Sequence, residues 1–164
     1  MLTSRKTNIL LIFIYKLKEE KKLHKLSRKE IQKILPHRDP FLFVDEVTDY
    51  IPGEYANGVK YVKEDEYYFK GHFPGNPIMP GVIIVETLAQ VGAVMMLTLD
   101  KFKGKIVLFA GIDKVRFKRI VKPGDKLELF VKVLNLKLNI GKGFGEAKVE
   151  GELACSAELL FSIV

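Results

Sequence analysis

One histidine and one carboxylate in this chain have the residue types and surroundings that acid–base chemistry requires. His72 lies in residues 71–81, whose three glycines and three prolines give a stiff backbone able to hold an imidazole and several amide groups. Glu86 follows Gly81 by five residues, within an apolar run where an unpartnered carboxylate is costly. Burial raises a carboxyl pKa above about 4.3, and histidine titrates near about 6.5, so the pair can exchange protons near neutrality.

Both side chains also have a purely structural interpretation. A lone histidine in a turn often does no more than bond to the backbone, and Glu86 could simply be tied to Gln90, four residues away on the same helix face, or to the backbone. The free amide groups expected at the helix start beside Gly81 favour a catalytic role. They would attract negative charge that develops on a carbonyl oxygen.

The element that must position Glu86 is a long apolar segment. Residues 82–97 are apolar almost throughout, and sixteen residues are too many for an ordinary strand. They therefore predict a helix that is buried on all sides, with Pro80 and Gly81 at its first turn. The acidic Glu86 argues against a membrane span.

The first half of the chain predicts a short helix and a hairpin. The helix begins at Ser27, where Ser27 and Glu30 have the spacing of a capping box, and it ends before Pro36. Residues 41–50 and 55–63 are rich in aromatic and β-branched side chains and predict two strands joined by a turn.

The second half of the chain shows the period-two alternation of strands. Across residues 114–118 this alternation puts three cations on one face of a strand. The apolar positions change from odd to even near residue 133, which indicates a β-bulge. We expect a turn around the glycines of residues 141–145, followed by a long half-buried strand that runs to residue 163.

These elements predict an α+β fold, with a curved, mainly antiparallel sheet of about five or six strands around one helix. Residues 26–164 form a single domain, and residues 1–25 form a basic N-terminal extension outside it. We interpret the extension as a tail or an over-extended start, with a membrane-surface or partner-binding helix and a secretory signal as alternatives. The apolar run at residues 9–15 is too short to cross a bilayer, so membrane contact is not expected.

Composition narrows the classes of function. A chain of 164 residues that is 48% hydrophobic is neither disordered nor a disulfide scaffold. Cys155 is the single cysteine and is interpreted as structural, which fits the reducing cytoplasm. The three histidines lack the further ligands that a zinc site needs. His37 is interpreted as a structural loop residue.

The charge pattern indicates an acidic partner and not a nucleic acid. Residues 1–30 carry nine basic and three acidic residues of a chain with net charge +7, so the remainder is nearly neutral. Within that remainder, residues 101–126 hold nine basic and two acidic residues. Only five of the 27 basic residues are arginine, which weakens the case for reading of bases.

Four motifs, in order, resemble the FabZ-type (3R)-hydroxyacyl-acyl carrier protein dehydratases of type II fatty acid synthesis. They are residues 34–42 (ILPHRDPFL), 71–81 (GHFPGNPIMPG), 86–90 (ETLAQ) and 112–117 (IDKVRF), and the similarity spans residues 27–164. Asp39 departs from the pattern, because the family more often has an aromatic residue there. The departure concerns the packing of the loop and not the chemistry.

The resemblance implies the hotdog fold, in which a long helix is wrapped by an antiparallel sheet. It also implies that His72 is the catalytic histidine, Glu86 the catalytic acid, and the Gly81 N–H the donor to the thioester carbonyl. The expected reaction removes water from (3R)-hydroxyacyl-acyl carrier protein to give the trans-2-enoyl product. A glutamate at position 86, where FabA-type dehydratase/isomerases carry aspartate, implies dehydration without efficient isomerisation.

The resemblance further implies dimers in which the histidine of one subunit faces the glutamate of the other, and assembly of these into hexamers. No metal or other cofactor is expected, since phosphopantetheine arrives with the acyl carrier protein. Candidates for an acyl tunnel are Phe73, Ile78, Met79, Ile83, Val85 and Leu88. Candidates for docking the carrier protein are Lys114, Arg116, Lys118, Arg119 and Lys122. A hotdog thioesterase and a non-catalytic acyl-thioester sensor are the alternative functions.

Overall fold

The computed structural model describes residues 25–164, so the predicted extension, apart from its last residue, lies outside the described residues. The elements, in chain order, are β1 (Leu26–Ser27), α2 (Arg28–Ile34), β2 (Glu46–Ile51), β3 (Tyr55–Tyr61), η1 (Tyr67–Lys70), α3 (Gly81–Leu97), η2 (Asp100–Phe102), β4 (Val107–Phe117), β5 (Lys126–Lys137), β6 (Ile140–Val149) and β7 (Glu152–Ile163). The two η elements are 3₁₀ helices.

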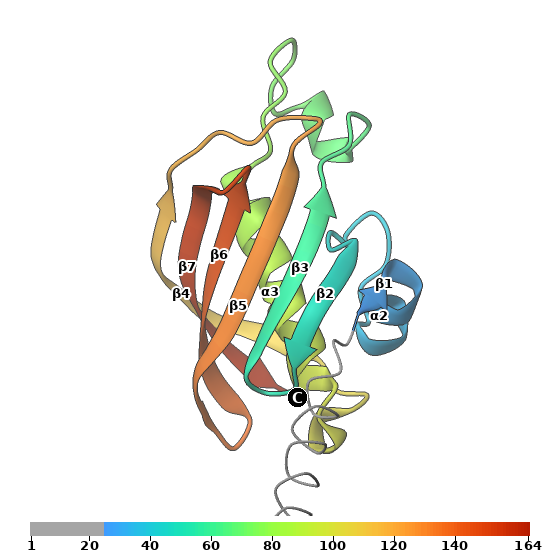
Figure 1. Cartoon of the computed structure of the whole chain (residues 1–164), viewed down its shortest axis with the longest axis vertical. Helices are drawn as coiled ribbons and strands as arrows, with labels where there is room; N and C mark the ends of the chain where they lie inside the picture. Colours follow the sequence, from blue (N-terminus) through green and yellow to red (C-terminus); the bar gives the residue numbers. More distant parts are fainter. Residues whose placement is uncertain (1–24) are drawn as a thin grey trace, which may run out of the picture.

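A single antiparallel sheet curves around α3 (Figure 1). Its strand order is β1-β2-β3-β5-β6-β7-β4, which leaves β4 at one edge. The α+β class and the hotdog arrangement are thus confirmed. The sheet has seven strands where about five or six were expected, because the two-residue β1 adds to the edge beside β2.

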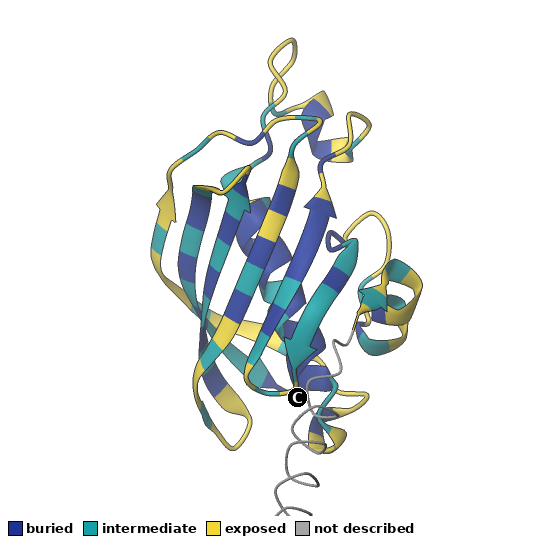
Figure 2. Ribbon diagram, viewed as in Figure 1, coloured by how far each residue is buried: buried dark blue, intermediate teal, exposed yellow. Residues whose placement is uncertain are grey.

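The central helix is buried, as its composition predicted. Eleven of the 17 residues of α3 are buried, among them Leu88 and Val91. Figure 2 shows the helix in the buried class behind strands that alternate between buried and more exposed positions. The helix approaches the sheet closely at Gly58, where a Cβ would lie 2.7 Å from a methyl group of Val91.

The prediction of a turn around residues 141–145 is wrong. These residues lie inside β6, and β5 and β6 are joined at Leu138 and Asn139. The glycines are there because neighbouring elements leave no room for side chains. A Cβ at Gly141 would overlap the Phe161 ring, and a Cβ at Gly145 would lie 3.3 Å from Leu88 of α3.

Two local predictions hold and one fails. The Glu30 carboxylate accepts a hydrogen bond from the Ser27 N–H at 2.8 Å, as expected for the cap of α2. The β-bulge near residue 133 is present as a register shift between Val133 and Asn135. The strand predicted to begin at residue 41 begins only at Glu46, because residues 35–45 are held by side chains from other elements, described below.

Candidate active site

Glu86 lies in the second turn of α3, with a side chain that is 17% exposed. Its Oε1 accepts a hydrogen bond from Gln90 Nε2 at 2.9 Å and lies 3.6 Å from His37 Nε2. Burial raises the pKa of the Glu86 carboxyl, and the hydrogen bond from Gln90 opposes part of that rise. Glu86 therefore keeps its proton to higher pH than an ordinary glutamate and is suited to donate it.

Gln90 joins Glu86 to the loop of residues 35–45. The Gln90 side chain is 1% exposed, and its Nε2 also donates to the Phe41 carbonyl at 2.8 Å. Its Oε1 accepts from the Phe43 N–H at 2.8 Å. The amide has one orientation that satisfies all three bonds, so the contact between Gln90 and Glu86 that the sequence suggested is part of a larger arrangement.

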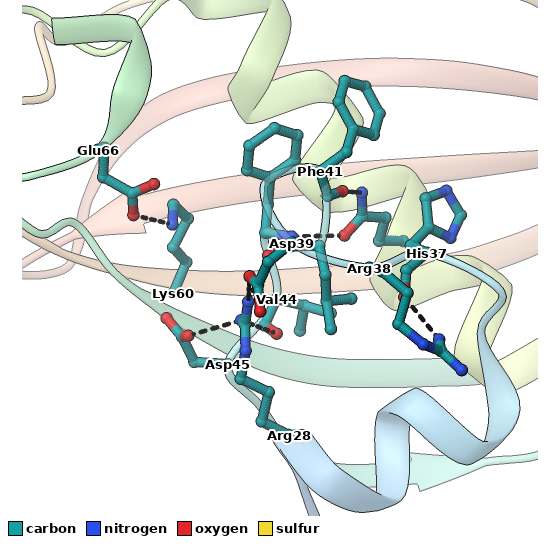
Figure 3. A network of polar contacts seen from close by, with 12 residues as sticks. Arg28, His37, Arg38, Asp39, Phe41, Val44, Asp45, Lys60 and Glu66 are labelled. Atoms are coloured by element: carbon teal, nitrogen blue, oxygen red, sulfur yellow. Dashed lines mark hydrogen bonds and ion pairs between the residues drawn. The ribbon is translucent and has the colours of Figure 1, made fainter.

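His37 also belongs to this arrangement, although the sequence analysis predicted only a structural role for it. Its ring stacks against Phe41 with a centroid separation of 6.4 Å (Figure 3). Burial lowers the pKa of His37, which favours the neutral imidazole beside Glu86. The motif of residues 34–42 pointed to the loop, but nothing local in the sequence indicated that the loop reaches a carboxylate about 50 residues later.

His72 has the hydrogen-bonding pattern of a base. Its Nδ1 lies 2.7 Å from the carbonyl oxygen of Ile78, which can only accept, so in the neutral ring Nδ1 carries the proton and Nε2 is unprotonated. The His72 carbonyl in turn accepts from the Ile78 N–H at 2.9 Å. The ring stacks on Phe73 with a centroid separation of 4.0 Å. These contacts orient the imidazole and leave Nε2 without a partner among the described residues.

Gly81 is the first residue of α3, and no described residue accepts a hydrogen bond from its N–H. Free amides are expected at a helix start. A side chain would not fit here, since a Cβ at Gly81 would lie 2.6 Å from the ring of Phe117. The Gly81 amide is therefore available to a carbonyl oxygen.

His72 and Glu86 have different side-chain partners within the described residues. The side-chain partners of His72 are Ile78 and Phe73, whereas those of Glu86 are Gln90 and His37. No hydrogen bond or ion pair joins the two within residues 25–164. His72 lies on the loop before α3 and Glu86 on the helix, each with its own set of side-chain contacts.

An apolar cavity of about 60 Å³ adjoins Glu86 between α3 and the sheet. On the helix side it is bordered by the small residues Ala89, Gly92 and Ala93, whose spacing puts them on one face and leaves the space open. That spacing is the signal in the sequence that could have located the cavity. The remaining lining comprises His37, Glu86, Gln90, Met95, Met96, Val107, Leu108, Phe109, Val131, Lys132, Val133, Gly143, Leu159 and Phe161.

None of the six predicted tunnel residues lines this cavity. Met79, Val85 and Leu88 are buried in the core, and Phe73 is exposed. The other two, Ile78 and Ile83, are half-buried. Their contribution to an acyl tunnel stays a prediction.

The five predicted docking cations differ in how free they are. Lys114 pairs with Glu158 at 2.8 Å, and its φ of 50° lies where the register of β4 shifts, so the regular alternation expected across residues 114–118 is interrupted. Arg119 pairs with Glu150 and Glu152 at 3.3 and 2.9 Å. The other three, Arg116, Lys118 and Lys122, are exposed and form no ion pair within the described part of the chain.

Membrane spans, metal ligands and the cysteine were also considered as functional features. Within residues 25–164, no helix is long and apolar enough to cross a membrane, and no three metal-ligating side chains gather. Cys155 is buried in β7, and burial raises the pKa of its thiol to about 11. Such a thiol is poorly suited to act as a nucleophile.

Known proteins resemble this chain in sequence and in fold. Residues 35–158 match the family model described as the FabA-like domain. In fold, the chain is similar to the dehydratase heterocomplex ApeI:P from Xenorhabdus doucetiae, with a TM-score of 0.70 and 18% identity, over 80% of this chain and 89% of that one. The fold and the family model thus define a FabA-like hotdog protein.

Curated relatives show to which group of FabA-like proteins the chain belongs. The 3-hydroxyacyl-[acyl-carrier-protein] dehydratase FabZ of Chloroflexus aggregans is 56% identical over 138 residues, covering 84% of this chain and 96% of that protein. The protein with the same description from Bacillus licheniformis is 54% identical over 138 residues, with coverage of 84% and 96%. The chain belongs to the FabZ family of FabA-like proteins. The resemblance seen in the four motifs is confirmed.

Proposed function

We propose that this protein is a (3R)-hydroxyacyl-acyl carrier protein dehydratase that forms trans-2-enoyl-acyl carrier protein and water in fatty acid elongation. The observation that carries the proposal is Glu86, a carboxyl group with a raised pKa beside an apolar cavity, in a chain about 55% identical to curated FabZ proteins. A protonatable carboxyl next to an apolar channel suits the removal of a hydroxyl group from an acyl chain.

The proposed mechanism uses three groups. His72 Nε2 accepts the proton from C2 of the acyl chain, and the electron pair of that C–H bond moves toward the thioester carbonyl. The Gly81 N–H at the start of α3 stabilises the charge on the carbonyl oxygen. As the C2–C3 double bond forms, the C3–O bond breaks and Glu86 protonates the departing hydroxyl, which leaves as water. The cycle ends with His72 protonated and Glu86 ionised, and a proton passed between them resets the site.

We further infer that the site is shared between two subunits, with His72 of one chain facing Glu86 of the other. Support comes from the lack of any hydrogen bond or ion pair between His72 and Glu86 within residues 25–164, and from β4, an edge strand that exposes large apolar side chains. Leu108 and Phe109 are 49% and 41% exposed and also line the cavity beside Glu86. An uncovered apolar edge strand favours pairing with a second copy. Three such dimers would form a hexamer.

The same three groups account for every proton in the reaction, so the proposed enzyme needs neither a metal ion nor an organic cofactor. The acyl carrier protein supplies the phosphopantetheine arm as part of the substrate. We place the enzyme in the cytoplasm, where that carrier and a reduced Cys155 belong together.

Carrier docking is proposed at the exposed cations Arg116, Lys118 and Lys122. We expect Arg116→Glu combined with Lys118→Glu to raise the apparent KM for carrier-bound substrate about tenfold, because like charges would then repel an acidic partner. Steady-state assays with carrier-bound and short N-acetylcysteamine thioesters measure the difference. The control is Lys63→Glu with Lys137→Glu, which changes the net charge equally at exposed positions elsewhere. An equal loss with both substrates would refute docking at this surface.

One assay tests the reaction itself. The purified protein is incubated with 3-hydroxybutyryl and 3-hydroxymyristoyl carrier protein, and the products are followed by mass spectrometry. The proposal predicts loss of the mass of one water with the thioester intact. Release of the free carrier thiol would identify a thioesterase, and unchanged substrate with measurable binding would identify a sensor.

A further inference from the structure

The loop of residues 35–45 contains no helix or strand, yet it places His37 beside Glu86. Three consecutive residues, Leu42, Phe43 and Val44, are at most 3% exposed. A buried irregular segment needs partners for its backbone groups, since unsatisfied ones are costly. The identity of those partners decides how firmly the loop is held.

Arg28, the first residue of α2, makes four hydrogen bonds to this loop, two to backbone carbonyls and two to carboxylates (Figure 3). Its Nη1 donates to the Val44 carbonyl at 3.1 Å and to Asp45 Oδ1 at 3.0 Å. Its Nη2 donates to the Leu42 carbonyl at 2.8 Å and to Asp39 Oδ1 at 2.6 Å. The planar guanidinium is a rigid donor, so four acceptors on one loop restrict where that loop can lie.

Gln90 binds the backbone of the same loop. Its amide contacts the Phe41 carbonyl and the Phe43 N–H, whereas Arg28 contacts the Leu42 and Val44 carbonyls. Arg28 and Gln90 therefore hold one short run of backbone, and both of them bind the peptide group between Leu42 and Phe43. Gln90 then donates its remaining proton to Glu86.

Asp39 adds an exposed carboxylate to this arrangement. It stands where the resemblance implies an aromatic residue, and its carboxylate completes the contacts of Arg28. The Asp39 side chain is 71% exposed, so its ion pair alone contributes little. The Asp45 side chain is 13% exposed, and this pair with the two carbonyls forms the stronger part of the contact.

We propose that Arg28 is a positioning residue for Glu86, which acts by holding residues 39–45 so that Gln90 is oriented and water is kept from the Glu86 carboxyl. Among the described residues, the titratable group beside Glu86 is His37 from the loop. Lys132 of β5 borders the same cavity, but it is exposed and its Nζ lies over the Phe144 ring. His37 is held beside Glu86 by the same loop, and burial favours its neutral form. The catalytic consequence rests on the proposed function, whereas the effect on the carboxyl does not.

The test compares Arg28→Met with wild type by ¹³C NMR titration of glutamate-labelled protein, with the Glu86 signal assigned by its absence in Glu86→Gln. Loosening of the loop admits water, so the pKa of Glu86 is expected to fall toward its ordinary value. Less of the acid then carries its proton. We expect kcat for a short thioester to fall about tenfold with KM within about twofold, because the acid is displaced and less protonated.

Lys142→Met is the matched control. Lys142 is 30% exposed and Arg28 is 31% exposed, and each lies within 4.0 Å of two carboxylates, but Lys142 pairs with Asp113 and Glu158 away from the loop. The control is expected to leave both the Glu86 titration and kcat unchanged. Asp39→Asn removes only the exposed ion pair and is expected to lower kcat about twofold to threefold with a small downward movement of the Glu86 pKa.

A lower melting temperature for Arg28→Met with an unchanged Glu86 titration and unchanged kcat would overturn the proposal, since Arg28 would then be merely structural. If Arg28→Met does not fold, Arg28→Lys decides, because lysine keeps the charge but lacks the planar group that reaches both carbonyls. An unchanged titration in that variant contradicts the proposal. The titration needs no substrate. A wild-type protein without dehydratase activity would therefore refute the proposed function and still leave the role of Arg28 to be decided by the carboxyl signal.

Discussion

Replacement of His72 by alanine is expected to lower kcat by about 10² to 10⁴-fold, the usual contribution of a positioned acid or base. The expectation rests on Nε2, which is the unprotonated nitrogen when Nδ1 donates to the Ile78 carbonyl. The measurement is the initial rate of enoyl thioester formation at saturating substrate. Unchanged circular dichroism and melting temperature would show that the variant is folded.

His72→Asn separates catalysis from a structural role in the turn. The asparagine amide can still donate to the Ile78 carbonyl, so it keeps the contact that Nδ1 makes, but it has no basic nitrogen. We expect Asn to be as inactive as Ala. Recovery of turnover by Asn would mean that His72 serves only to hold the loop, and the proposed mechanism would then be wrong.

Glu86→Gln is expected to cause a loss of similar size, because glutamine has nearly the shape of glutamic acid but no proton to give to a leaving hydroxyl. In the pH profile of the wild-type rate, the inflection caused by Glu86 should lie above the pKa of an ordinary glutamate, since burial raises the pKa of Glu86. It should be absent from the residual activity of the variant. Turnover near that of the wild type would contradict the assignment of Glu86 as the acid.

Glu86→Gln is expected to raise the stability of the protein at high pH, although it lowers the activity. A carboxyl whose pKa is raised by folding binds its proton more tightly in the folded state, so the wild type loses stability as the pH rises through that range. Glutamine never ionises. We therefore expect the melting temperature of Glu86→Gln to be higher than that of the wild type at pH 8 but not at pH 5. Thermal unfolding at the two pH values measures the difference. An enzyme that retains a costly charge at its site is expected to show this exchange of stability for activity.

Features with local physical causes were predictable from the sequence. Ser27 and Glu30 satisfy each other within one helical turn, and the apolar run that became α3 is long enough to identify itself as a helix. The bulge at Val133 follows from a change in the apolar phase. Glu86 stood out because a carboxylate in such a run needs an explanation.

Features caused by distant residues were not predictable. Residues 41–45 have the composition of a strand, but contacts with Arg28 and Gln90, 14 to 49 positions away, hold them outside the sheet. The glycines of β6 were interpreted as a turn because Leu88 and Phe161, which exclude side chains there, are remote in sequence. The place of His37 beside Glu86 has the same origin.

The central claim is that His72 and Glu86 of different subunits form one site, and mixing of two inactive variants tests it most directly. His72→Ala and Glu86→Gln chains are co-expressed in equal amounts with different tags, and the activity of the mixture is compared with that of each variant alone. In a shared site, random pairing unites an intact histidine with an intact glutamate in about a quarter of the sites, so about a quarter of wild-type activity should return. If both groups act within one chain, no mixture contains an intact pair, and activity that stays at the level of the separate variants would contradict the account.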